Sequence, residues 1–300
     1  MILIADSGST KTDWTVTDNG KTIQRLSGQG INPFMQTADN IRDIISKELI
    51  NRLNNADTIT EVYFYGAGCR KEKQHILTNI FQELLKNVNN IDVETDLTAA
   101  ARALFGQSEG IACILGTGSN SGYYNGKEIT QNISPLGYIL GDEGSGAVLG
   151  KIFINALYKG RLSDKMVKTF ETETGLNMAD IIDNVYRRPL ANRFLASLSP
   201  FISKHIDDRD IENIVIENFK NFFRLNIKQY QRQDLPIGAI GSIAHHYSVQ
   251  LKKAALTEGL EITKIIKTPM ENLIRFHTNQ KKYITIAVRS HFAHHKQTLY

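Results

Sequence analysis

The sequence has few cysteines, no long hydrophobic run and no concentrated basic region. Its 300 residues include only two cysteines, Cys69 and Cys113, which excludes a disulfide framework and leads us to expect the reducing cytoplasm. No stretch approaches the ~18 consecutive apolar residues of a membrane span, and the N-terminal apolar run is too short for a signal peptide. The net charge of +4 is spread along the chain, without the basic, aromatic-interleaved stretch that indicates a nucleic-acid partner. A globular protein with neither a membrane nor a nucleic-acid partner is therefore expected.

The N-terminal stretch pairs a buried strand with a turn of small and hydroxyl-bearing residues. Apolar residues 2–5 precede Asp6, the turn runs from Ser7 to Thr10, and a second strand is expected over 12–16. Backbone N–H groups and hydroxyls in such a turn can cradle a phosphate, and an acid at a strand end can hold a hard divalent cation. An ordinary hairpin, whose Asp and Gly serve the turn, accounts for the same residues. The stretch alone leaves both interpretations open.

This stretch returns in the second half of the chain. Residues 5–9 (Ala-Asp-Ser-Gly-Ser) align with residues 115–119 (Leu-Gly-Thr-Gly-Ser), and each copy follows an apolar strand. Each copy also leads into a second strand, an Asn-Gly pair and a third strand, and Asn-Gly between such runs is a strong hairpin signal. The repeat predicts two similar domains, each opening with a three-stranded meander and each presenting a phosphate-sized turn to a shared cleft.

Apolar spacing divides the chain further. The first half has the pattern βββαβαβα and ends in the Gly-bounded stretch 106–110. We therefore expect an N-terminal domain over 1–107, a C-terminal domain over 108–279, and a tail over 280–300. Residues from about 160 to 233 predict helices with little β-propensity, which indicates a helical insert in the second domain.

A loop with two acids, Gly141 to Gly146, comes before a predicted helix. Its sequence is Gly-Asp-Glu-Gly-Ser-Gly, and a helix N-terminus favours anions and hydrogen-bond acceptors. Asp142 and Glu143 could bind sugar hydroxyls or the water on a metal, whereas Asp142 or Ser145 could simply cap the helix. Three glycines in six residues exceed what a cap needs, so this pattern favours binding.

Two other strand-to-helix junctions carry weaker signals. Asp96 ends one strand and starts a helix, where it could be an N-cap or a general base that takes a proton from an attacking hydroxyl. From the residues alone, the cap is the simpler interpretation. Gly241 and Ser242 could seat an adenosine or a phosphate, but they also form a common strand-to-helix turn.

In this order, the five stretches resemble the sugar-kinase, heat-shock-70 and actin superfamily. Over residues 1–278 the chain is similar, more narrowly, to the BadF/BadG/BcrA/BcrD ATPase family and its N-acetylglucosamine kinase branch. Residues 6–14 resemble the first phosphate motif, 115–120 the second, and 240–244 the adenosine motif. Residues 141–146 are the most distinctive match to the N-acetylglucosamine kinases.

The resemblance implies an α/β fold of two ribonuclease-H-like (actin-like ATPase) domains that close over ATP and Mg²⁺. It implies that Asp6 holds the metal and that Asp96 is the catalytic base. The residues matched to sugar contacts, with the acid beside them, are Asn32, Asn120, Asp142 and Glu143. The residues matched to ATP binding are Gly8, Ser9, Thr10, Lys11, Gly116, Thr117, Gly118, Ser119, Gly241 and Ser242.

The resemblance implies ATP- and Mg²⁺-dependent phosphorylation of a small-molecule amino sugar, with N-acetylglucosamine converted to its 6-phosphate as the leading assignment. Glucosamine, N-acetylmuramic acid and related amino sugars stay open, and a homodimer is compatible with the resemblance. One alternative is an ATPase that activates a CoA-ester reductase or dehydratase through a [4Fe–4S] cluster, although Cys113 lies inside a strand. Another is a non-catalytic sugar- or ATP-sensing protein.

Overall fold

The structure is a computed structural model that describes residues 1–8 and 10–279. The chain divides into two compact units: unit 1 contains Met1–Gly106 and the chain from Pro269, and unit 2 is Gln107–Thr268. This division differs from our expectation for residues 269–279, which we placed in the second domain. The expected tail, 280–300, lies outside the described residues. None of the helices in the described part of the chain is both long and apolar enough to cross a bilayer.

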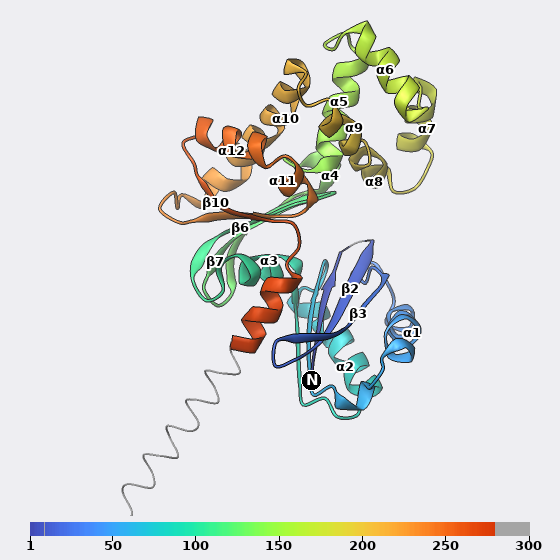
Figure 1. The fold of residues 1–300 in the computed structure, drawn as a ribbon, viewed down its shortest axis with the longest axis vertical. Helices are drawn as coiled ribbons and strands as arrows, with labels where there is room; N and C mark the ends of the chain where they lie inside the picture. Colours follow the sequence, from blue (N-terminus) through green and yellow to red (C-terminus); the bar gives the residue numbers. More distant parts are fainter. Residues whose placement is uncertain (9, 280–300) are drawn as a thin grey trace, which may run out of the picture. The chain divides into compact units, whose positions relative to one another are not determined.

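Unit 1 is built on a five-stranded sheet with the order β3-β2-β1-β4-β5, of which β2 and β3 are labelled in Figure 1. Its strands are β1 (Ile2–Ser7), β2 (Lys11–Asp18), β3 (Lys21–Gln29), β4 (Glu61–Gly66) and β5 (Asn90–Thr95). The first three strands pair antiparallel, and β4 and β5 extend the sheet in parallel from β1. Asn19 and Gly20 both have positive φ, at 48° and 82°, as the two-residue hairpin predicted from Asn-Gly requires.

Side chains alternate between the two faces of this sheet, and each face packs on different helices. Leu3 and Ala5 point to the core formed with α1 (Ala38–Glu48) and α2 (Gln74–Leu84). In that core the ring of Trp14 lies 5.8 Å from that of Phe64 and 6.2 Å from that of Phe81. The opposite face carries α3 (Asp96–Phe105) and helical residues 270–279. Short 3₁₀ turns complete the unit: Ile50–Arg52, Ala56–Thr58 and Lys71–Lys73.

Unit 2 repeats the same sheet topology. Its strands are β6 (Glu109–Leu115), β7 (Ser119–Asn125), β8 (Ile129–Ile133), β9 (Ile237–Ile240) and β10 (Ile262–Ile266). They follow the order β10-β9-β6-β7-β8, with β6-β7-β8 antiparallel and β9 and β10 parallel to β6. The repeat seen in the sequence therefore corresponds to two sheets of identical strand order.

Most helices of unit 2 come from the segment between β8 and β9 (Figure 1). They are α4 (Gly137–Leu140), α5 (Gly146–Tyr158), α6 (Asp164–Thr174), α7 (Met178–Tyr186), α8 (Ala191–Ala196), α9 (Ser199–Lys204) and α10 (Arg209–Phe222). A π-helix, η4 (Phe223–Ile227), and a 3₁₀ turn, η5 (Lys228–Tyr230), follow α10; α11 (Ser242–His246) and α12 (Ser248–Thr257) follow β9. Together they bury one face of the sheet, because alternate β6 residues, such as Cys113, join their hydrophobic core.

A buried polar network fixes α3 and helical residues 270–279 on unit 1. Nη1 of Arg102 on α3 donates to the Tyr65 hydroxyl at 2.8 Å and to Oδ2 of Asp92 at 2.9 Å. The Tyr65 hydroxyl lies 2.8 Å from Nε2 of His277, whose pKa burial and the Arg102 charge lower to about 3. His277 is therefore neutral at physiological pH, and Arg102 is the cation of this network, paired with Asp92 and Glu94.

Replacing Arg102 tests how much this network stabilises unit 1. Arg102→Leu leaves Asp92 and Glu94 without their cation, and we expect a loss of about 2–4 kcal/mol in unfolding free energy. Arg42→Leu is the control, because Arg42 makes exposed ion pairs with Asp39 and Glu83 that contribute less than about 1 kcal/mol. Urea unfolding of both variants measures the difference; equal losses would contradict the assignment.

Candidate active site

Asp6 stands near the end of β1, on the face that carries α3. Ile2, Ile4 and Asp6 alternate with the core residues Leu3 and Ala5, so the Asp6 carboxylate points away from that core. In the sheet register, Asp6 lies opposite Asp13 on β2. The acid predicted to hold the metal therefore lies at a partly exposed strand end with a second acid next to it.

The turn after Asp6 is held by main-chain and hydroxyl hydrogen bonds. Gly8 N donates to Lys11 O at 2.9 Å, which closes the hairpin between β1 and β2. The buried Ser7 hydroxyl lies 2.7 Å from that of Thr12 and accepts the N–H of Ile31 at 2.9 Å. Gly8, Thr10 and Lys11 of the predicted phosphate turn are exposed; Ser9 lies outside the described residues.

Asp96 is the first residue of α3, but it is not the N-cap. Thr95 takes that place, because its side chain accepts the N–H of Thr98. Asp96 instead accepts the N–H of Leu97 on Oδ1 at 2.9 Å. Burial raises its pKa above the ordinary value, against the opposing effect of these backbone N–H groups. The capping role that the sequence favoured is thus filled by the preceding residue, and the carboxylate of Asp96 is not required for it.

Asn32 lies in the loop after β3 and packs against the glycine turn that follows β4. Its Oδ1 accepts the N–H of Phe34, and its own N–H donates to Oε1 of Gln36 at 2.8 Å. Gly68 has φ +78°, and a Cβ there would lie 2.1 Å from Oδ1 of Asn32. Glycine at 68 therefore both permits the turn and leaves the space that the Asn32 amide occupies.

In unit 2, the second phosphate-type turn is joined to the start of α5 through the backbone. Gly146 N donates to Gly116 O at 2.8 Å, and Ala147 N donates to Thr117 O at 3.1 Å. Ser145 is the N-cap and accepts the N–H of Val148. The first N–H groups of α5 are consequently satisfied within the protein.

The side chain of Asp142 points from the acidic loop toward the second phosphate-type turn, residues 116–119. Its φ is +55°, an uncommon conformation for a residue other than glycine, and its carboxylate faces the backbone N–H of Ser119. A Cβ on Gly118 would lie 3.0 Å from Oδ2 of Asp142. Burial, opposed by that N–H, raises the pKa of Asp142 to about 6. The predicted sugar and phosphate residues of unit 2 are therefore in direct contact.

The side chains of Glu143 and Asn120 each accept a hydrogen bond from a side-chain amide. Oε2 of Glu143 accepts from Nδ2 of Asn226 at 3.2 Å. Oδ1 of Asn120 accepts the Ser121 N–H and Nδ2 of Asn132, at 2.9 and 2.8 Å. Sequence reasoning did not find Asn226 or Asn132, because an asparagine in a helix or strand carries no signal of the distant loop that it contacts.

Gly241 and Ser242, the predicted adenosine motif, lie at the end of β9, next to residues 115–119 and 142–146. Gly241 has φ +123°, and a Cβ there would lie 2.3 Å from the carbonyl oxygen of Leu115. A Cβ on Gly146 would lie 3.1 Å from the Ile243 side chain. Unit 2 thus brings residues 115–119, 142–146 and 241–243 together, although they are far apart in sequence. Ser242 is exposed.

Comparison with known proteins identifies the family. Residues 5–233 match the model of the BadF/BadG/BcrA/BcrD ATPase family. The chain belongs to this family. No curated protein matches the chain.

Solved structures confirm the predicted fold of this ATPase family member. A candidate N-acetylglucosamine kinase from Porphyromonas gingivalis is 48% identical, with TM-score 0.90, over 93% of this chain and 99% of that chain. Another from Chromobacterium violaceum is 16% identical, with TM-score 0.70, over 92% and 98%. A ROK family glucokinase from Streptomyces griseus, in complex with glucose and AMPPNP, is 14% identical, with TM-score 0.52, over 91% and 97%. The two five-stranded α/β sheets are thus those of a two-domain actin-like ATPase.

Within this ATPase, Asp6 has an unusual electrostatic environment. Burial raises the pKa of Asp6 to about 7, and the negative charges of Asp96 and Asp13 add to the effect, whereas Lys11 opposes it. Among the described residues, no cluster of three or more His, Cys, Asp or Glu side chains could hold a metal. A cation at Asp6 would therefore take most of its ligands from outside the protein, as Mg²⁺ at phosphate sites does.

The raised pKa of Asp6 makes stability depend on pH. The folded state binds a proton with a pKa of about 7, against 3.8 for an unperturbed Asp, so stability is lost as pH rises from about 4 through 7. Asp6→Asn removes this loss. Without metal or nucleotide, we expect the variant to melt above wild type at both pH values, with a gap roughly 3–8 °C larger at pH 8 than at pH 5. Thermal unfolding at both pH values, with exposed Asp18→Asn as control, measures it; equal shifts at the two values would contradict the raised pKa.

Proposed function

We propose that the protein is an ATP-dependent sugar kinase that transfers the γ-phosphoryl group of ATP to an amino sugar, N-acetylglucosamine first, at its C6 hydroxyl. The observation that carries the proposal is the 48% identity to the candidate N-acetylglucosamine kinase over almost the whole of both chains. Family membership supports ATP as the donor. Because ATP is the donor, we place the reaction in the cytoplasm.

The site residues have distinct proposed roles. The exposed turn of Gly8, Thr10 and Lys11, together with residues 116–119, would bind the phosphates, and Gly241 with Ser242 the adenosine end. Asn32, Asn120, Asp142 and Glu143 would bind the sugar. The closeness of Asp142 to Gly118, where a Cβ would lie 3.0 Å from Oδ2 of Asp142, supports this assignment, because it places a proposed sugar residue beside a proposed phosphate residue. The cleft between the domains and the homodimer stay predictions.

Asp96 is the proposed general base. Its carboxylate would accept the proton of the sugar hydroxyl while the oxygen of that hydroxyl forms a bond to the γ-phosphorus. The bond between that phosphorus and the β,γ-bridging oxygen breaks, and ADP leaves. The Leu97 N–H orients the carboxylate through Oδ1, and its raised pKa makes it a better proton acceptor at neutral pH.

Asp6 is the proposed Mg²⁺ residue. Its donor set fits a hard cation, because burial and the neighbouring acids Asp96 and Asp13 penalise its charge and a divalent cation would relieve that penalty. When bound, Mg²⁺ would neutralise charge on the transferring phosphoryl group. Lys11 pairs with Asp13 at 2.9 Å, which leaves Asp6 as the acid of this turn available to a cation.

The activator alternative is disfavoured by the cysteines. Cluster ligands must be thiolates that can reach the partner subunit. Cys69 and Cys113, the two cysteines of the sequence, are both buried. Burial raises the pKa of Cys69 to about 12, and it raises that of Cys113 as well. Both thiols therefore stay protonated and enclosed, and we do not propose a cluster.

Sugar-dependent turnover tests the proposed function. Purified protein is given ATP, Mg²⁺ and a panel of amino and N-acetyl sugars; ADP release and the mass of a sugar phosphate are measured. We expect turnover on N-acetylglucosamine, with kcat in Asp96→Asn lower by on the order of 10²–10⁴ and nucleotide binding retained. Tight ATP binding without any sugar phosphate, or near-normal kcat in the variant, would refute the assignment.

Gly68→Ala tests the role of Asn32 without changing Asn32 itself. The added Cβ would collide with Oδ1 of Asn32, 2.1 Å away, so we expect the KM for the sugar to rise roughly 10-fold or more with little change in the KM for ATP. Gly175→Ala is the matched control, because Gly175 also has positive φ but nothing within 4 Å of its Cβ position. Steady-state kinetics separate the two; an unchanged sugar KM in Gly68→Ala would argue against Asn32 as a sugar contact.

A further inference from the structure

The acidic loop of unit 2 rests directly on α10 and the π-helix that continues it. Oδ1 of Asn218 accepts the N–H of Gly144 at 3.0 Å, and its Nδ2 donates to Ser145 O at 3.3 Å. Eight residues later, Nδ2 of Asn226 donates to Oε2 of Glu143 at 3.2 Å. One helical segment therefore holds three consecutive residues of the loop.

Both asparagines are buried, at 1% and 6% exposure for Asn218 and Asn226. Burial of an amide is costly unless its polar atoms are hydrogen-bonded. Here the partners are the main chain of the loop and the carboxylate of Glu143. An apolar residue at either position would fill the space without directing the loop, so the amides fix its orientation as well as its packing.

The π-helix brings the two asparagines to one face. In an α-helix, positions eight apart differ by about 80° around the axis. The wider i→i+5 winding of Phe223–Ile227 turns less per residue, which rotates Asn226 back toward the face of Asn218. π-turns of this kind occur frequently at functional sites.

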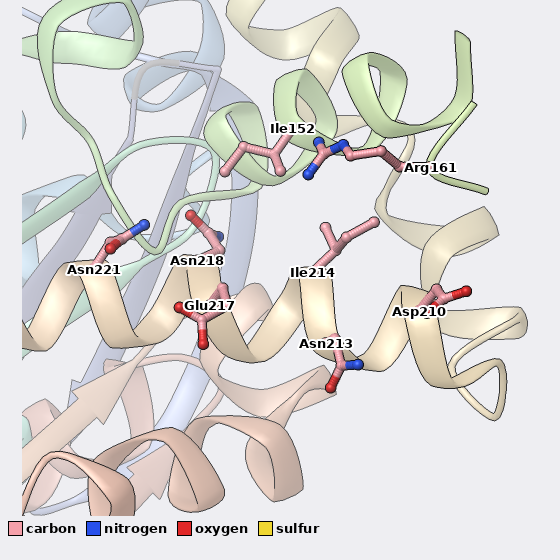
Figure 2. A pocket seen from close by; sticks show the side chains of 8 residues that line it. All are labelled: Ile152, Arg161, Asp210, Asn213, Ile214, Glu217, Asn218 and Asn221. Atoms are coloured by element: carbon pink, nitrogen blue, oxygen red, sulfur yellow. The ribbon is translucent and has the colours of Figure 1, made fainter. Parts of the chain in front are cut away.

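A close contact sets the distance between loop and helix. Gly144 has φ +80°, and a Cβ there would lie 2.9 Å from the Cβ of Phe222, the last residue of α10. The backbone of the loop therefore touches the helix directly. Figure 2 shows the side chain of Asn218 on α10 directed toward α5, among the residues that line a groove between the two helices.

We propose that Asn218 and Asn226 are positioning residues for the acidic loop: Asn218 orients its backbone, and Asn226 aims the Glu143 carboxylate as an acceptor for a sugar hydroxyl. The part that concerns the sugar rests on the proposed function. The helical insert thereby sets the geometry of a loop that also carries Asp142.

Asn226→Asp and Asn218→Ala test the two contacts, and Asn221→Ala is the control. Asn226→Asp is isosteric but replaces the donor with a second carboxylate. Asn221 lines the same groove on α10, and among the described residues no hydrogen bond links it to the loop. Asn226→Gln tests whether an amide restores the function. The measurements are sugar and ATP KM, kcat, calorimetric N-acetylglucosamine binding, and hydrogen–deuterium exchange of peptides covering residues 141–146.

We expect Asn226→Asp to raise the sugar KM and Kd about 10-fold or more, as loss of a hydrogen bond to a charged group predicts. The KM for ATP should stay within about twofold of wild type. Asn226→Gln should recover part of the sugar binding. Asn218→Ala should speed exchange of the Gly144 amide about 10-fold or more, and Asn221→Ala should match wild type. Equal changes in sugar and ATP KM, or unaltered exchange in Asn218→Ala, would overturn the inference.

The exchange measurement does not depend on turnover. If wild type neither binds nor phosphorylates any sugar, the proposed function fails. Protection of the 141–146 peptides in wild type, and its loss in Asn218→Ala, would then still support the positioning of the loop by α10, whereas unprotected wild-type peptides would refute it.

Discussion

Close backbone packing at one end of the unit 2 sheet is the constraint on which the proposed nucleotide and sugar residues depend. Gly146 N donates to Gly116 O at 2.8 Å, and Gly241 approaches the carbonyl of Leu115 so closely that a Cβ would lie 2.3 Å away. Only glycine allows the backbone at position 241 to come this close to Leu115. Asp142 lies beside Gly118 of the phosphate turn, where a Cβ on Gly118 would be 3.0 Å from its Oδ2. A side chain at Gly241 would push the turn after β9 away from the end of β6.

Unit 1 has the same strand order, but its strand ends bring acidic side chains close to one another. Asp6 leaves β1 on the face opposite the aromatic core, and α3 places Asp96 on that same face. Burial and, to a smaller extent, repulsion from Asp96 raise the pKa of Asp6, so ionised Asp6 is unfavourable unless a cation binds beside it. On the same face, Arg102 anchors α3 to the sheet through hydrogen bonds to Tyr65 and Asp92. Arg102 thus pairs with Asp92 and Lys11 with Asp13, whereas no ion pair to Asp6 or Asp96 is found among the described residues.

The sequence predicted the features that arise from local chemistry. Alternating and apolar runs located the strands, and Asn19-Gly20 predicted a turn whose two positive φ angles the structure shows. The repeated turns at Gly8 and Gly116 predicted two units of the same topology. Features set by long-range contacts could not be predicted: Thr95 as the cap in place of Asp96, and helical residues 270–279 packed on unit 1. The latter depends on Tyr65 and His277, which are 212 positions apart.

The helical insert gives unit 2 contacts that the repeated sheet lacks. Under the proposed function, the turns of both units supply backbone N–H groups and acids that suit phosphate and a cation. In unit 2 the insert adds α10, which contacts Gly144 through Asn218 and Glu143 through Asn226. A change in α10 or in its π-turn would move the acidic loop while leaving β6, β7 and their turn in place. Under the proposed function, the repeated sheets therefore carry the nucleotide residues, and the insert positions the acidic loop, which adds to the sugar residues Asn32 and Asn120.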